Sequence, residues 1–137
     1  MPLSSGPPAP TPRRPSDDLR DLLELPQELA LRGVPYRPSF RSRVGSTQDL
    51  VAAAARAGEP EGLVVFADLQ TSGRGRAGRR WEAPPGTAVM FSLLWRPPVG
   101  PDHLSTLPLV AGLAIAVAVA AVGGPRVEIK WPNDCLV

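Results

Sequence analysis

Residues 71–81 read TSGRGRAGRRW, a run that interleaves three glycines with four arginines. Arginine carries a planar, permanently charged guanidinium that binds carboxylate and phosphate oxygens through paired hydrogen bonds. Glycine tolerates positive φ and lets backbone N–H groups approach a bound group closely. The run therefore predicts either a loop shaped around a particular anion or an unstructured basic tract that binds nucleic acid.

The sequence on either side of this run favours the shaped loop. Residues 63–70 (LVVFADLQ) and 87–95 (TAVMFSLLW) are apolar enough to form strands, and only short connections separate them from the run. The run lacks the G-K-[ST] of a nucleoside-triphosphate phosphate loop. It also leads to a strand instead of a helix, which is the wrong context for a dinucleotide-binding fingerprint.

The neighbouring elements are predicted from hydrophobic periodicity and turn residues. Residues 36–44 alternate between apolar residues and arginines, which indicates a strand with one solvated face. Residues 46–57 form a helix in this prediction, with Ser46 and Asp49 as a capping box and Gly58 at its end. The stripe that we expect this helix to bury consists of Leu50, Ala53, Ala54 and Ala57.

The apolar segments in the second half of the chain are predicted to be core elements. Residues 87–95 are almost continuously apolar, which is typical of a central strand covered on both faces. Residues 107–122 predict a buried helix, because sixteen residues fall short of the ~20 that span a membrane. Residues 126–131 and 135–137 predict a hairpin with the turn PND, and a hairpin at this point leads us to expect further strands beyond residue 137.

Composition narrows the class of protein. The chain has 137 residues, a net charge of +2, fourteen arginines and one lysine, Lys130. A single cysteine and a single histidine exclude a disulfide framework and a Cys/His zinc site, and they favour a reducing cytoplasm. Six prolines among the first fifteen residues predict a disordered leader. A pI near 9.3 permits contact with nucleic acid without requiring it.

Four segments in order, GST, QTSGRGRAGRRW, TAVMFSLLWRP and KWPND, resemble the catalytic domain of biotin–protein ligase, also called biotin–[acetyl-CoA-carboxylase] ligase. The resemblance covers residues 36–137. It implies an α+β fold in which helices flank a mixed, largely antiparallel sheet, as in class II aminoacyl-tRNA synthetases. Residues 1–33 then form a proline-rich leader with short helical turns, and residues 34–137 form the N-terminal part of the catalytic domain.

The resemblance also implies a reaction and its participants. Biotin is adenylated with ATP and Mg²⁺ to biotinyl-5′-AMP, and biotin is then transferred to a lysine of a biotin carboxyl carrier protein domain of a carboxylase. No side chain is assigned as a metal ligand. The residues implied are Arg76 and Lys130 for catalysis; Ser46, Thr47, Gln48, Gln70, Arg74, Gly75 and Arg76 for biotin; and Arg74, Arg79, Trp81 and Asn133 for the nucleotide.

Several of these residues also have an ordinary structural interpretation. Ser46 can be a helix cap, Gln70 a loop amide, Trp81 a core residue, Lys130 a solvated strand residue and Asn133 a turn former. Gln48 departs from the family, which usually has Asn there. A family lysine that matters for adenylation falls beyond residue 137, so we expect the 137-residue chain to be poorly active alone.

Two other functions remain open at this point. One is a lipoate or octanoate ligase-like acyltransferase, which has the same fold and a different acyl group. The other is a nucleic-acid-binding module that uses the arginines on phosphates, with an affinity that falls steeply with salt. Residues 1–33 are too short for a winged helix-turn-helix, which argues against a DNA-repressor role, and no role at a membrane is expected.

Overall fold

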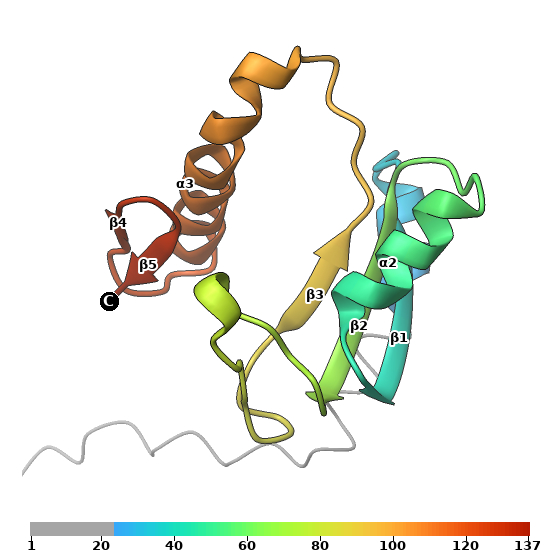
Figure 1. Cartoon of the computed structure of the whole chain (residues 1–137), viewed down its shortest axis with the longest axis horizontal. Helices are drawn as coiled ribbons and strands as arrows, with labels where there is room; N and C mark the ends of the chain where they lie inside the picture. The colour runs from blue at the N-terminus through green and yellow to red at the C-terminus, as the bar shows by residue number, and fades with distance from the viewer. Residues whose placement is uncertain (1–23) are drawn as a thin grey trace, which may run out of the picture. The chain divides into compact units, whose positions relative to one another are not determined.

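The computed structural model describes residues 24–137, so the predicted leader over residues 1–15 lies outside the described residues. The described chain forms two compact units, one ending at Arg96 and the other running from Pro97 to Val137. Both units contain helix and strand, with strands of mixed direction (Figure 1). This confirms the α+β class, whereas the predicted boundary between residues 33 and 34 stays a prediction.

Residues 24–31 are helical and lead into β1 of the first unit. The helix ends in two hydrogen bonds, from Gly33 N–H to the Ala30 carbonyl at 3.1 Å and from Val34 N–H to the Leu29 carbonyl at 2.9 Å. Gly33 has a φ of +65°, which glycine adopts without a steric penalty. This pattern is a Schellman motif, and it satisfies carbonyl groups at the helix end.

The first unit is built on a β-α-β arrangement. Strand β1 (Arg37–Val44) is followed by helix α2 (Thr47–Arg56) and strand β2 (Leu63–Gln70), which matches the three elements predicted here. Strands β1 and β2 are parallel, with Arg37 opposite Leu63 and Val44 opposite Gln70. The register therefore places the end of β2 beside the start of α2, because α2 begins three residues after β1 ends.

Strand β3 (Met90–Leu93) pairs antiparallel with β2 and completes a sheet of order β1-β2-β3. The expectation of a central strand over residues 87–95 is wrong within the described residues, where β2 is central and β3 lies at the edge. Phe91 on β3 is half-exposed and contacts Phe66 of β2, with ring centroids 5.5 Å apart. The run is apolar without alternation, so it does not distinguish a central strand from an edge strand.

The core of the first unit lies between α2 and the sheet. Val51 of α2 packs with Val65 of β2 and with Leu94, which follows β3. The buried face of α2 carries Thr47, Val51, Ala54 and Ala55, so only Ala54 of the predicted stripe lies on it. The prediction was wrong by about one residue, because seven of the ten helical residues from Thr47 are either apolar or small and several faces look equally apolar.

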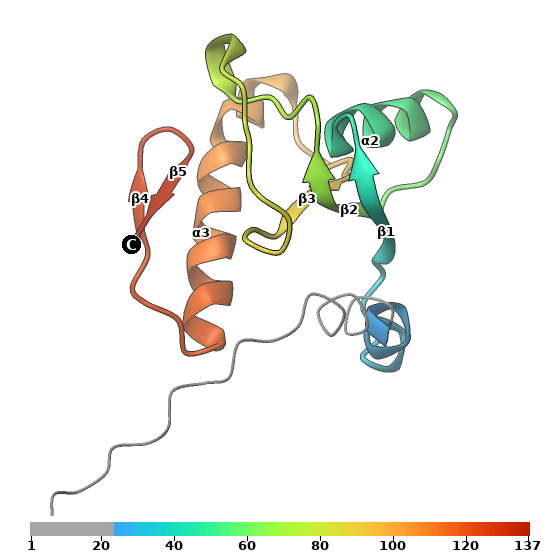
Figure 2. The same cartoon turned by 90° about the horizontal axis from the view of Figure 1, so that it is seen from below.

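The second unit contains a short 3-10 helix (Pro101–Thr106), helix α3 (Leu107–Ala121) and a hairpin of β4 (Glu128–Lys130) and β5 (Asp134–Leu136). The hairpin and its turn are as predicted. The hairpin lies beside α3 in both views (Figures 1 and 2). Contact is closest at Gly112, where an added Cβ would lie 3.5 Å from Ile129 and 3.7 Å from the Cys135 Sγ.

Helix α3 is present as predicted, but it is not buried among the described residues. Gly112 is its one buried residue, and Val110, Leu113 and Val117 are each half-exposed or more. Within its unit, the two short strands and the preceding 3-10 helix contact it. The helical stretch Pro101–Ala121 has 21 residues and a mean hydropathy of 2.2, so by length and composition alone it is long and apolar enough to cross a membrane. A single helix of this kind is weak evidence, because core helices of soluble proteins meet the same criterion.

Candidate active site

The Gly/Arg segment forms a closed loop that leaves β2 and returns toward β3. An isolated antiparallel bridge pairs Arg74 with Arg80. Gly75 N–H donates to the Arg79 carbonyl at 2.7 Å, and Trp81 N–H donates to the Gly73 carbonyl at 2.9 Å. A 3-10 turn over Arg76–Gly78 closes the tip. The segment is therefore a shaped loop with its own backbone hydrogen bonds.

The glycines of the loop serve two different purposes. Gly73 permits a close approach, because an added Cβ would lie 2.5 Å from the Trp81 carbonyl oxygen. Gly75 has an extended φ of −94° and needs no positive φ, contrary to the sequence-based expectation. Gly78 has a φ of +73°, and its neighbour Ala77 also lies in the left-handed region at +54°. The tip turn therefore places one ordinary residue in a conformation that favours glycine.

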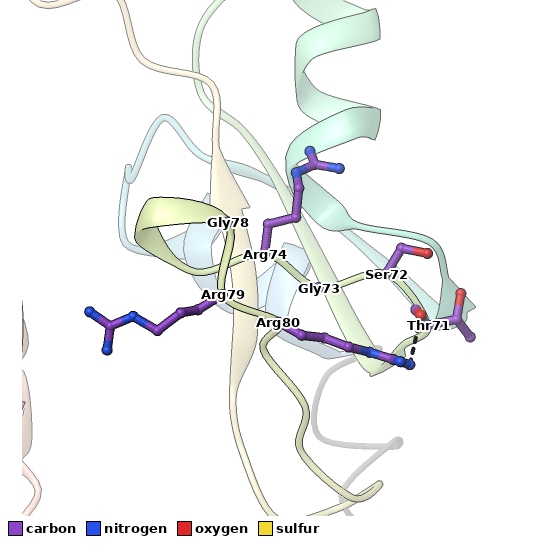
Figure 3. Close-up of a pocket in the computed structure, with 7 residues that line it drawn as sticks. All are labelled: Thr71, Ser72, Gly73, Arg74, Gly78, Arg79 and Arg80. Carbon is purple, nitrogen blue, oxygen red and sulfur yellow. Dashed lines mark hydrogen bonds between the residues drawn. The ribbon is translucent and has the colours of Figure 1, made fainter.

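The loop borders an open hollow of about 370 Å³ (Figure 3). Three of its arginines and the residues at its root line this hollow: Thr71, Ser72, Gly73, Arg74, Gly78, Arg79 and Arg80. The three guanidinium groups point in different directions, with Arg74 directed toward α2 and Arg79 directed the opposite way from Arg80. The positive charge of the loop is therefore spread around the hollow.

Arg74 pairs with Asp49 in the first turn of α2. Its Nη1 donates to Asp49 Oδ2 at 2.9 Å and its Nη2 donates to Oδ1 at 2.6 Å, so the contact is bidentate. The hydrogen bond from Arg74 is the largest cause that holds the pKa of Asp49 below its usual value, and the same bond raises the pKa of Arg74. Asp49 therefore ties the root of the loop to α2 and does not complete a capping box.

The other arginines of the loop have different surroundings. Arg80 forms an ion pair with Glu82, with Nε and Oε1 2.7 Å apart, and its Nη2 donates to the Thr71 carbonyl at 3.4 Å. Within residues 24–137, the Arg79 guanidinium has no hydrogen bond or ion pair and is exposed. Arg76 lies in the 3-10 turn at the loop tip.

A cluster of uncharged polar side chains lies where β2, β3 and the start of α2 meet. The Gln70 Oε1 accepts from Thr47 N–H at 2.8 Å and from the Thr47 hydroxyl at 3.2 Å. The Thr47 hydroxyl also lies 2.8 Å from the Ser92 hydroxyl, and Gln70 Nε2 donates to the Met90 Sδ at 3.5 Å. Gln70 thus satisfies the first free N–H of α2 from a different element of the fold.

This arrangement changes the interpretation of Ser46. It occupies the N-cap position with extended backbone angles, yet its side chain makes no capping hydrogen bond. Ser46 and Thr47 are nearly fully buried, at 3% and 2% exposure, whereas Gln48 is exposed. The predicted capping box is therefore wrong, because Ser46 makes no capping hydrogen bond and the Asp49 carboxylate binds Arg74. The Ser46 hydroxyl has no side-chain hydrogen bond within the described part of the chain.

The remaining predicted site residues lie apart along the chain. Trp81 is 54% exposed, which excludes it from the core. Lys130 is exposed on β4 in the second unit, and Asn133 lies in the adjoining turn, where its Nδ2 donates to Asp134 Oδ1 at 3.1 Å. The structure brings Thr47, Gln70 and the root of the Gly/Arg loop together in the first unit, and it describes Lys130 and Asn133 within the second.

Two residues of this site were missed from the sequence. Asp49 was interpreted as part of a cap, and Ser92 was one small residue in an apolar strand. Ser92 carries a lone hydroxyl in an apolar strand, and β3 directs this side chain toward Thr47. The isolated hydroxyl was the sequence signal that could have identified it. No sequence pattern indicated the Asp49–Arg74 pair, because 25 residues separate its members.

A sequence profile of the biotin/lipoate A/B protein ligase family matches residues 41–137, which include the whole Gly/Arg loop and the polar cluster around Thr47 and Gln70. The chain belongs to the biotin/lipoate A/B protein ligase family.

Individual members of this family resemble the chain over most of its length. The bifunctional ligase/repressor BirA of Bacillus spizizenii is 37% identical over 98 residues, covering 72% of this chain and 30% of BirA. The biotin–[acetyl-CoA-carboxylase] ligase of Mycobacterium tuberculosis is 40% identical over 100 residues, covering 69% of this chain and 38% of that ligase. The chain thus spans about a third of the length of these relatives.

Solved structures of family members agree in fold. The biotin protein ligase of Aquifex aeolicus in complex with biotin and ATP has a TM-score of 0.60 and 33% identity, over 74% of this chain and 41% of that one. The biotin protein ligase of Leishmania major in complex with biotinyl-5-AMP has a TM-score of 0.61 and 30% identity, over 73% of this chain and 47% of that one. These similarities confirm the predicted family and the class II synthetase-like fold.

Proposed function

We propose that this chain carries the biotin-binding and adenylate-binding part of an ATP-dependent biotin ligase. The observation that carries the proposal is the arginine-lined hollow of the Gly/Arg loop, which starts one residue after Gln70 and its contact with Thr47. Guanidinium groups suit carboxylate and phosphate oxygens, and a cluster of uncharged donors and acceptors suits a cyclic urea. Biotin and the adenylate together contain all of these groups.

The reaction joins two anions, so charge neutralisation is its main electrostatic requirement. A carboxylate oxygen of biotin attacks the α-phosphorus of ATP, an O–P bond forms, and the bond to pyrophosphate breaks. The amine of a carrier lysine then attacks the carbonyl carbon of biotinyl-5′-AMP, and AMP leaves. We assign charge neutralisation in the first step to Arg74, Arg76 and Arg79, with Gly75 allowing close backbone approach.

The uncharged contacts with biotin fall to the residues near the start of α2. Ser46 is the strongest of these, because its hydroxyl is not used as a helix cap and its residue is nearly enclosed. Thr47 and Gln70 already share hydrogen bonds, so a bound urea would join that cluster. Gln48 is exposed on α2 and has the weakest structural support of the four.

The nucleotide contacts of Trp81, Lys130 and Asn133 rest on the resemblance of their motifs. Trp81 adjoins the loop and is exposed enough to cover an adenine ring. Lys130 and Asn133 belong to KWPND, and we assign Lys130 to the activated carboxylate or phosphate. Among residues 24–137, no group of three or more His, Cys, Asp or Glu residues lies close enough to hold a metal ion, so Mg²⁺ would be held mainly by the phosphates of ATP.

The wider setting of the protein follows from the same assignment. We infer that the acceptor is a biotin carboxyl carrier protein domain of a biotin-dependent carboxylase, and that the protein acts in the cytoplasm, where such acceptors and a reduced cysteine are expected. One of its relatives is a bifunctional ligase/repressor. We propose the ligase activity for this chain.

Biotin-dependent ATP–pyrophosphate exchange tests the proposal, with lipoate in place of biotin as the competing substrate and calorimetry as a direct measure of acid binding. We expect the chain to bind biotin and not lipoate. We also expect any ATP–pyrophosphate exchange to require biotin. Arg79→Gln should lower exchange roughly a hundredfold, the usual cost of removing one transition-state donor. Arg32→Gln, which removes an exposed arginine in the turn after the first helix, is the matched control. Preference for lipoate, or a folded chain that binds neither acid, would contradict the proposal.

A further inference from the structure

The Arg74–Asp49 contact occupies one of the faces through which a guanidinium binds an anion with two hydrogen bonds. Both terminal nitrogens of Arg74 donate to Asp49, one to each carboxylate oxygen. A guanidinium binds a carboxylate or a phosphate most favourably through two parallel hydrogen bonds of this kind. While the ion pair is intact, Nε–H and one N–H on each terminal nitrogen stay available, but the pair holds the guanidinium toward α2. A ligand anion in the hollow and Asp49 therefore compete for the direction of this guanidinium.

The direction of the side chain fits this competition. Arg74 lines the hollow, yet its guanidinium points toward α2 and away from Arg79 and Arg80 (Figure 3). The backbone of the loop root is already fixed by other bonds, from Thr71 N–H to the Val44 carbonyl at 2.9 Å and from Ser72 N–H to the Gly45 carbonyl at 2.8 Å. These bonds hold the loop root together with the Asp49 pair, and what Asp49 alone fixes is the direction of the Arg74 guanidinium.

Solvent exposure makes the exchange of partners feasible. The side chains of Arg74 and Asp49 are 51% and 60% exposed, and an exposed ion pair contributes little net free energy because water screens it. A ligand that carries two or more negative charges attracts the same guanidinium more strongly than a single carboxylate does. An aspartate carboxylate is ionised at neutral pH, and the hydrogen bond from Arg74 lowers the pKa of Asp49 further, so the competing charge is present.

We propose that Asp49 is a positioning residue that acts as an internal competitor: it holds Arg74 away from the hollow until an anionic ligand displaces its carboxylate. This inference rests on the proposed function only in taking the ligand to be an anion. The displacement turns Arg74 from α2 toward the bound anion and leaves Asp49 solvated. The cost of displacing Asp49 weakens binding to every anion at this site, so removing the carboxylate should increase affinity.

Inorganic pyrophosphate is a suitable probe, because it needs neither biotin nor catalysis to bind. Calorimetry on the 137-residue chain would compare wild type with Asp49→Asn and with the double variant Asp49→Asn/Arg74→Gln. Glu59→Gln is the matched control, since it makes the same charge change and breaks an exposed ion pair with Arg37, 3.1 Å long in the structure. Glu59 lies beyond the other end of α2, ten residues along the chain from Asp49.

We expect Asp49→Asn to bind pyrophosphate roughly two- to fivefold more tightly than Glu59→Gln, a range that corresponds to losing an exposed competing pair. The gain should vanish in the double variant. A gain in affinity is informative, because general damage to the structure would weaken binding. Equal or weaker binding by Asp49→Asn, a gain that survives in the double variant, or no pyrophosphate binding by any variant would overturn the inference. Lipoate preference in the exchange assay would contradict the proposed function and leave this result intact.

Discussion

The side-chain oxygen of Gln70, at the end of β2, accepts a hydrogen bond from the backbone N–H of Thr47, the first residue of α2, at 2.8 Å. This contact joins two elements whose ends lie 23 residues apart in sequence. The N-terminus of α2 is thus capped by a side chain of β2 and not by a residue next to it in the sequence. The Ser46 hydroxyl makes no capping hydrogen bond, and it lies at the position where a biotin contact is proposed.

Replacing Gln70 by Ala should destabilise α2 by about 1 kcal/mol, the usual cost of losing an N-terminal cap. Ser46→Ala should change stability by less than about 0.5 kcal/mol, because its hydroxyl makes no capping bond. Urea denaturation, together with hydrogen exchange at the Thr47 amide, measures both effects. Equal destabilisation by the two substitutions would show that Ser46 caps the helix after all.

Gly73→Ala should disrupt the Gly/Arg loop, because its Cβ would lie 2.5 Å from the Trp81 carbonyl oxygen. The backbone must then move and lose the bond from Trp81 N–H to the Gly73 carbonyl, at a cost of roughly 1–3 kcal/mol. Gly45→Ala is the control, since nothing lies within 4 Å of an added Cβ there. Tryptophan fluorescence during urea unfolding would report the change, and similar effects of both substitutions would argue against a close approach of Gly73 to Trp81.

Ala77→Gly should be neutral or stabilising by up to about 1 kcal/mol, because Ala77 has a φ of +54° and glycine adopts positive φ without the Cβ clash. Ala52→Gly, at an exposed position within α2, should instead cost about 1 kcal/mol. The comparison uses the same chemical change in two backbone conformations. Destabilisation of similar size at both positions would mean that the loop tip does not hold Ala77 in the left-handed region.

The Arg74–Asp49 pair should show a defined dependence on pH. The pKa of Asp49 is held below its ordinary value of 3.8, first by the hydrogen bond from Arg74 and further by the charges of Arg74 and Arg56. Its stabilising contribution is therefore fully present above pH 3.8 and is lost as pH falls through the lower pKa of the folded state. Carboxyl NMR titration should find the Asp49 pKa higher in Arg74→Gln than in wild type. An unchanged titration would exclude the pair in solution.

Local sequence patterns determined several secondary-structure elements of this protein. The alternation over residues 36–44, the apolar run 63–70 and the glycine after α2 were sufficient to predict β1, β2 and the helix between them. Such features depend on neighbours within a few residues, where periodicity and turn chemistry act. The Gly/Arg run and KWPND resemble motifs of biotin–protein ligase, and that resemblance was sufficient to predict the family.

Tertiary structure alone decided which partners the polar side chains take. Ser46 and Asp49 satisfy the local pattern of a capping box, yet Gln70 binds the helix N-terminus and Arg74 binds the carboxylate. Both partners come from segments that the parallel register of β1 and β2 brings beside the start of α2. Periodicity also did not predict that β3 lies at the sheet edge and that α3 is exposed among the described residues. Burial depends on which other elements cover a face. A pattern in sequence specifies which bonds a side chain is able to make, and the fold selects among them.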